Sequence, residues 1–134
     1  PHNFGAIIRT CEACGVKNII IPKDRGVTVN DTVVKTSTGA LSRVNIIMVT
    51  NLVSAINELK RDGYFVYSAE ADGEDFRKVD YNDKKLLVIG SEGNGLSKLV
   101  RNNSDVIISI PMKGEVNSLN ASVAAAILIY GIGE

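Results

Sequence analysis

Two loops of small and polar residues carry the side chains best suited to chemistry in this sequence. The first, GSEGNG at residues 90–95, follows an apolar run at residues 86–89. The second, PMKGEVNSLN at residues 111–120, follows an apolar run at residues 106–110. Each loop leads into a helical pattern, and ligands of open parallel sheets bind beyond the carboxyl ends of strands. The chemistry is therefore expected in these two loops.

The first loop suits a flat ligand bound by main chain. Its glycines permit close backbone approach and leave amides exposed, which fits a nucleoside-like group. It is not a P-loop, because Lys98 follows Ser97 rather than preceding it, and a dinucleotide fingerprint would need a small residue at position 98. A tight turn with Glu92 in solvent is an equally favoured interpretation of this loop taken alone.

The second loop places Asn117, Ser118, Asn120 and Ser122 at the start of an apolar helix. One of these side chains is enough to cap the helix. Four exceed what capping requires, so we favour a ligand over capping alone.

At the amino end, Asn3 and Arg9 lie within two turns of a helix predicted over residues 3–14. Taken alone, Arg9 reads as a solvated helix cation. Cys11 and Cys14 are predicted to pack in the interior, because zinc needs about four ligands and His2 is the only histidine. No metal site is expected.

The elements that must position these residues follow from the apolar pattern. Apolar runs predict strands at residues 16–22, 45–49, 64–69, 86–89 and 106–110. Helices are predicted at residues 3–14, 29–41 and 52–62, from about 97, and from about 121. Residues 69–84, with six acidic side chains, read as a solvated loop. Strands that are apolar along their length and alternate with helices predict an α/β fold, with a parallel sheet covered by helices on both faces.

Composition bounds the function. The 134 residues suit one domain, and 15 basic residues balance 15 acidic ones, so no global field attracts nucleic acid. No apolar run approaches the roughly 18 residues of a membrane span, and no secretory signal is visible, so we expect a cytoplasmic protein without membrane contact. The chain begins at Pro1 without a methionine, and we expect an RNA-binding domain upstream of it.

The stretches NFGAIIRTCEACG, LLVIGSEGNGLS and ISIPMKGEVNSLNASVA, in this order, resemble the three signature motifs of the SpoU, or TrmH-like, branch of the SPOUT RNA 2′-O-ribose methyltransferases. The resemblance spans residues 1–134, and IPKDRGVTVNDTVVKTSTGA resembles the subgroup that methylates a guanosine ribose in 23S rRNA. The acidic residue that commonly precedes the first motif is absent. The resemblance implies S-adenosylmethionine as cofactor, RNA (rRNA rather than tRNA) as substrate, a homodimer whose interface completes the site, and a deep trefoil knot near the carboxyl end.

Matching positions give the site that the resemblance implies. Its catalytic residues are Asn3, Arg9, Glu92, Ser118 and Asn120. Its cofactor-binding residues are Ala69, Glu70, Gly90, Glu92, Gly93, Leu96, Ile110, Met112, Leu119 and Asn120. The resemblance implies that Arg9 activates the hydroxyl. Because a guanidinium normally stays protonated, we expect Arg9 to stabilise the developing alkoxide, or to act as the base only if its surroundings strongly perturb it, with Asn3 and Glu92 orienting it. The alternatives are a tRNA 2′-O-ribose methyltransferase, a resistance-conferring rRNA methyltransferase, and a non-catalytic nucleotide- or RNA-binding module.

Overall fold

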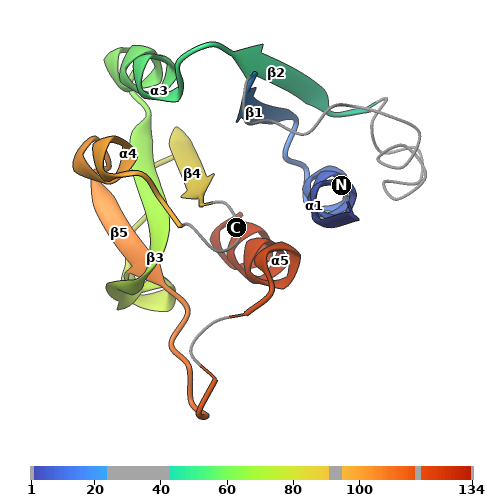
Figure 1. Ribbon diagram of the computed structural model, residues 1–134, viewed down its shortest axis with the longest axis vertical. Helices are drawn as coiled ribbons and strands as arrows, with labels where there is room; N and C mark the ends of the chain where they lie inside the picture. The colour runs from blue at the N-terminus through green and yellow to red at the C-terminus, as the bar shows by residue number, and fades with distance from the viewer. Residues whose placement is uncertain (1, 24–42, 91–94, 117–118, 134) are drawn as a thin grey trace.

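The computed structural model describes residues 2–23, 43–90, 95–116 and 119–133, with side chains described from Phe4 onward (Figure 1). The helix predicted at residues 29–41 lies outside this part. The described residues contain five strands, close to the predicted positions and all paired in parallel. They are β1 (Asn18–Pro22), β2 (Asn45–Val49), β3 (Phe65–Asp75), β4 (Lys85–Ile89) and β5 (Val106–Ser109).

The strands hydrogen-bond as two groups, β1-β2 and β4-β3-β5, where the sequence had predicted a single sheet. Side chains join the groups instead. Ile19 of β1 and Leu87 of β4 both pack on one buried cluster formed by Cys11, Ala125 and Ile129. The two sheets therefore share a core without sharing a hydrogen-bond ladder.

The helices begin and end where local chemistry predicts. The helix α3 (Leu52–Arg61) starts at Asn51, whose side chain accepts a hydrogen bond from the Ser54 amide at 3.0 Å, and Gly63 with φ +97° follows its end. The short helix α4 (Lys98–Asn102) is capped by Ser97 in the same way. These caps fix the directions in which the chain leaves the strand ends.

Helices cover both faces of the β4-β3-β5 sheet, as predicted. Val66 of β3 packs with Ile56 of α3 and Val100 of α4. Its neighbour Tyr67 points to the other face, where it packs with Leu128 of α5 (Ala121–Ile132). All of these side chains are buried. The sheet is thus the middle layer of an α/β fold.

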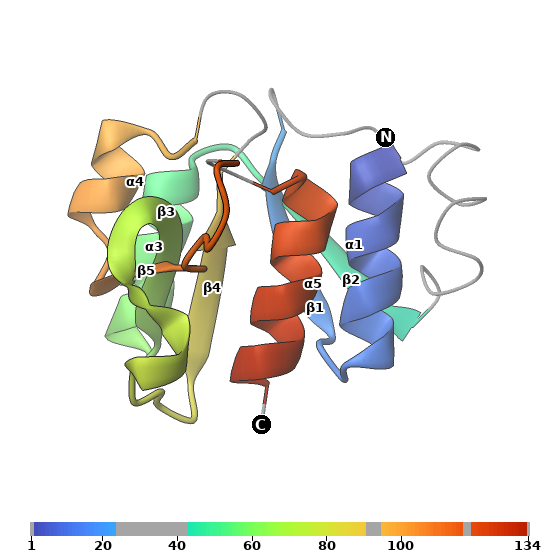
Figure 2. The ribbon, with the colours of Figure 1, turned by 90° about the horizontal axis from the view of Figure 1, so that it is seen from below.

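The helices α1 (His2–Ala13) and α5 lie side by side, with α5 between α1 and the three-stranded sheet (Figures 1 and 2). Phe4 and Ile8 of α1 also pack with Val44 against the β1-β2 pair. The last helix therefore links the two halves of the molecule.

The prediction of a solvated loop over residues 69–84 is wrong for its first half. The strand β3 continues to Asp75, with an irregularity in its pairing with β5 between Ala69 and Glu74. A Cβ atom at Gly73 would lie 2.6 Å from the backbone of Ile107 and Ile108, so a glycine is needed there. Strand pairing uses the backbone, so acidic side chains that point to solvent do not prevent it.

The second half of that segment is held against the core. Phe76, at the start of the 3₁₀ turn η2 (Phe76–Lys78), is buried, and its carbonyl accepts a hydrogen bond from the Tyr81 hydroxyl at 2.6 Å. The Tyr67 hydroxyl accepts one from the Asn82 amide at 3.0 Å. The buried Phe76 and the hydrogen bonds of Tyr81 and Tyr67 thus hold this stretch against the core despite its polar composition.

Candidate functional site

Strand register brings predicted site residues to one edge of the three-stranded sheet. Ala69 in β3 pairs with Ile89 of β4 on one side and with Ile108 of β5 on the other. Gly90 follows β4 directly, and Glu70 follows Ala69. Residues far apart in the chain therefore meet at the carboxyl end of β4.

The two ends of the GSEGNG loop lie in backbone contact. A Cβ atom at Gly90 would lie 2.6 Å from the carbonyl oxygen and 2.8 Å from the Cα of Gly95. Gly95 has φ +65°, a left-handed conformation that favours glycine. The backbones of these two residues therefore touch, and no side chain fits at position 90.

Glu70 connects this loop to a polar cluster. One carboxylate oxygen, Oε2, accepts a hydrogen bond from the Leu96 amide at 3.3 Å, and the other forms an ion pair with Arg101 of α4. Arg101 also makes two hydrogen bonds to Asp72, at 3.0 and 2.8 Å. These hydrogen bonds from Arg101 hold the pKa of Asp72 below its ordinary value, and those to Asp72 and Glu70 raise the pKa of Arg101.

Sequence reasoning missed Arg101. It lies 31 residues from Glu70 and 29 from Asp72, and no local spacing relates the three. The only indication of this contact in the sequence is the acidic stretch after Ala69, which contains more carboxylates than a solvent-exposed strand end requires.

At the second loop, Asn120 caps α5. Its side-chain oxygen accepts hydrogen bonds from the amide of Ser122 at 2.9 Å and from the Ser122 hydroxyl at 2.7 Å. The capping interpretation is thus correct for this residue. Ile110 and Met112 are half-buried and Leu119 is exposed, on the path from β5 to α5. Ser118, like Glu92 and Gly93 of the first loop, lies outside the described residues.

The residues predicted on α1 lie elsewhere. Arg9 is exposed, on the side of α1 opposite the buried Phe4, Ile8 and Cys11. Asn3 belongs to the first turn of α1, and its side chain is not among those described. Because α5 separates α1 from the three-stranded sheet (Figure 2), one chain places the first motif and the strand edge on different sides of that helix.

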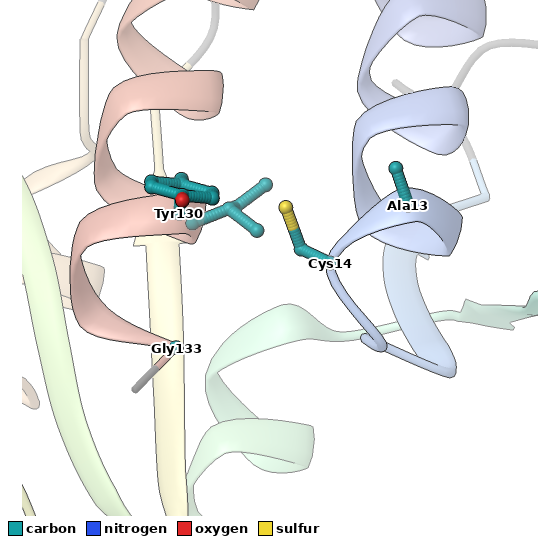
Figure 3. A pocket seen from close by; sticks show the side chains of 5 residues that line it. Ala13, Cys14, Tyr130 and Gly133 are labelled. Carbon is teal, nitrogen blue, oxygen red and sulfur yellow. The ribbon is translucent and has the colours of Figure 1, made fainter.

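The carboxyl ends of α1 and α5 enclose a pocket of about 130 Å³ lined by Ala13, Cys14, Ile129, Tyr130 and Gly133 (Figure 3). The nearby Cys11 is buried among apolar residues, as predicted, and burial together with the neighbouring Cys14 raises the pKa of its thiol to about 11. Its thiol therefore stays protonated at neutral pH. Among the described residues, no three His, Cys, Asp or Glu side chains are grouped to hold a metal, and no described helix is long and apolar enough to cross a membrane.

The sequence model described as the SpoU rRNA Methylase family matches residues 1–130. The chain belongs to this family. A protein of Staphylococcus haemolyticus that carries the name of a TrmH family tRNA/rRNA methyltransferase is 51% identical over 133 residues, which cover 98% of this chain and 53% of that protein. The chain thus spans about half the length of the curated relatives it matches.

Solved structures share the fold. The SpoU methyltransferase AviRb of Streptomyces viridochromogenes, crystallised with AdoMet, superposes with a TM-score of 0.90 at 29% identity, over 99% of this chain and 55% of that one. A structure described as giving insight into 2-OH methylation of C/U34 on tRNA superposes with a TM-score of 0.84 at 26% identity, over 97% of this chain and 85% of that one. The predicted α/β architecture with parallel strands and covering helices is confirmed.

Proposed function

We propose that this chain is the catalytic domain of an S-adenosylmethionine-dependent RNA methyltransferase that modifies a ribose 2′-hydroxyl, with a guanosine of 23S rRNA as the favoured target. The observation that carries the proposal is the meeting of Gly90, Gly95 and Glu70 at the strand edge of a fold that AviRb shares and uses to hold AdoMet. A tRNA ribose is the second candidate, supported by the tRNA-modifying structure.

The strand ends carry the small and apolar residues that a nucleoside-like cofactor would contact. Gly90 and Gly95 bring the backbone of the first loop together there, and Ala69, Leu96, Ile110 and Met112 follow or flank the same strand ends. When bound, S-adenosylmethionine supplies an activated methyl group to the ribose oxygen. The chain's own task is then to align the hydroxyl and to stabilise the charge that develops as its proton leaves.

In this proposal, residues of the first motif act on the ribose hydroxyl that accepts the methyl group. A guanidinium is a permanent cation with several donors, so Arg9 stabilises the developing alkoxide in this proposal. Asn3 and Glu92 orient Arg9, and Ser118 belongs to the same proposed catalytic set. Glu92 and Gly93 complete the cofactor loop, and Leu119 and Asn120 close it from the second loop.

The separation of Arg9 from the strand edge supports a homodimer. The outer side of α5 exposes Val123, Ile127 and Tyr130, at positions i, i+4 and i+7 of one helix face. Large apolar side chains gathered on one face mark an interaction surface. We propose that a second copy covers this face and that its α1 brings Arg9 to the partner's strand edge.

Three further proposals complete this assignment. An RNA-binding segment outside residues 1–134 selects the substrate, because the zero net charge of this domain offers little general attraction for phosphates. The carboxyl-terminal part forms the trefoil knot that the family resemblance implies. The protein acts in the cytoplasm.

Substitution of Arg9 tests the proposed chemistry. Arg9→Ala is expected to lower methyl transfer from labelled S-adenosylmethionine to total ribosomal and transfer RNA by about a hundredfold, the typical effect of removing a group that stabilises developing charge. Binding of S-adenosylhomocysteine should not change. Arg61→Ala, at an exposed arginine near the end of α3, is the matched control. A near wild-type rate in Arg9→Ala would contradict the role of Arg9, and mapping the labelled nucleotide decides between the targets.

A further inference from the structure

The cluster of Arg101, Glu70 and Asp72 contacts the carboxyl end of the GSEGNG loop through Glu70. Exposed fractions of the side chains fall from 64% for Asp72 through 39% for Arg101 to 24% for Glu70. The cluster thus runs from the surface inward and ends at the carboxylate that accepts the Leu96 amide. Glu70, at the inner end of the cluster, contacts the loop, whereas Asp72, at the outer end, is exposed to solvent.

Both oxygens of Glu70 already have partners inside the chain. Oε1 pairs with Arg101, and Oε2 accepts the Leu96 amide at 3.3 Å. The same Oε2 would lie 3.2 Å from a Cβ atom at Gly95, so the carboxylate touches the residue that packs on Gly90. Glu70 therefore contacts the loop backbone directly.

The Leu96 side chain is fixed independently. It packs against the buried cluster of Ile56, Val66 and Val100, so the core positions the side chain and Glu70 positions the amide. We propose that Arg101 is a positioning residue of the methyl-donor site: it orients the Glu70 carboxylate, which holds the backbone of residues 95 and 96 against Gly90. This inference rests on the proposed function, because it assigns Arg101 to the donor-binding step.

The guanidinium is the group that this task requires. Arg101 offers one edge to both oxygens of Asp72 and still reaches Glu70 through the shared Nη1. A lysine ammonium is a point charge without this planar fork and would hold the two carboxylates less rigidly. Arg101→Lys should therefore keep the charge and recover only part of the positioning.

The chain contains a matched control pair. Arg77 makes the same kind of two-bond contact to Asp75, at 3.0 and 2.8 Å, but the partners are two residues apart and Arg77 is exposed. A partly exposed ion pair contributes little to stability by itself. Arg77→Gln thus removes a comparable pair that has no contact with residues 90, 95 or 96 among its described hydrogen bonds.

The test measures amide hydrogen exchange at Leu96 and S-adenosylhomocysteine binding in the full protein. In Arg101→Gln we expect exchange at Leu96 to be about tenfold faster and the Kd to rise about five- to tenfold, the scale of one charge-assisted hydrogen bond. In methyl transfer, KM for the donor should rise more than kcat falls. Arg101→Lys should lie between, and Arg77→Gln should match wild type in all three measurements.

The outcomes separate the inference from the proposed function. Wild-type protein that binds no S-adenosylhomocysteine overturns both. Wild-type protein that binds it, with Leu96 exchange and Kd unchanged in Arg101→Gln or changed equally in Arg77→Gln, overturns the inference alone. If Arg101→Gln does not fold, Asp72→Asn, which keeps the Arg101–Glu70 pair, replaces it and should show a smaller effect of the same sign.

Discussion

Different interactions stabilise the carboxyl edge of the β4-β3-β5 sheet and the helix α5. At the sheet edge, the backbone of Gly90 lies against that of Gly95, and Glu70 ties the Leu96 amide to an arginine. On α5, Leu128 and Ile132 are buried against the sheet and apolar residues remain exposed on the opposite side. The first region depends on exact backbone approach, whereas the second depends on apolar area.

This difference indicates how the two regions divide the proposed reaction. Among the described residues, the contacts of Glu70 with Leu96 and Arg101 and of Arg101 with Asp72 lie within one chain. The α5 face has no cover within the described residues of one chain. Donor binding should therefore survive changes that separate two copies, while methyl transfer should not.

Substitution of Gly90 should produce the largest effect on the sheet edge. In Gly90→Ala the new Cβ would lie 2.6 Å from the Gly95 carbonyl oxygen, so the backbone must shift. Overpacking of this kind costs about 3 kcal/mol in unfolding free energy, measured by urea denaturation. Binding of S-adenosylhomocysteine, measured by calorimetry, should weaken by at least about tenfold because the backbone of the proposed donor loop is displaced.

Gly114→Ala is the control, since a Cβ there would meet nothing within 4 Å. It should leave both stability and binding close to wild type. If Gly90→Ala binds S-adenosylhomocysteine normally, the sheet edge is not the donor site. The proposed division between donor binding at the sheet edge and dimer formation on α5 is then wrong.

Substitution of Ile127 tests the α5 face. A charge at Ile127, which is 37% exposed, should weaken dimer formation by about 2 kcal/mol, the size of an interface hot spot. Ile127→Asp should elute as a monomer in gel filtration, retain S-adenosylhomocysteine binding and lose methyl transfer. Leu99→Asp, at a residue 64% exposed on α4, is the matched control and should behave as wild type. A wild-type protein that elutes as a monomer would refute the dimer.

The sequence predicted what local patterns determine. Apolar runs located all five described strands, and the helices predicted from residue 52 and from about residue 97 begin after the caps Asn51 and Ser97, because capping depends on neighbouring amides. The strand-edge position of Gly90 followed from the order of strands and loops. These features need only short-range chemistry and the general geometry of parallel sheets.

Long-range contacts escaped prediction. The extension of β3 to Asp75 depends on pairing with β5 and on Gly73, which lets the two backbones approach. The Glu70–Arg101 contact joins residues 31 positions apart, and the division of the strands into two hydrogen-bonded groups depends on pairing between distant segments. The roles of Asn3, Arg9, Glu92 and Ser118 stay predictions from the family resemblance.

Substitution of two helix caps, Asn120 of α5 and Asn51 of α3, should produce the smallest effects. Asn120 and Asn51 each accept a backbone hydrogen bond, at 2.9 and 3.0 Å, so Asn120→Ala and Asn51→Ala should each lower the free energy of unfolding by about 1 kcal/mol. If Asn120 also borders the donor, only its variant should weaken S-adenosylhomocysteine binding in calorimetry. Equal binding in the two variants would reduce Asn120 to a cap and leave the donor contacts of the second loop to its other residues.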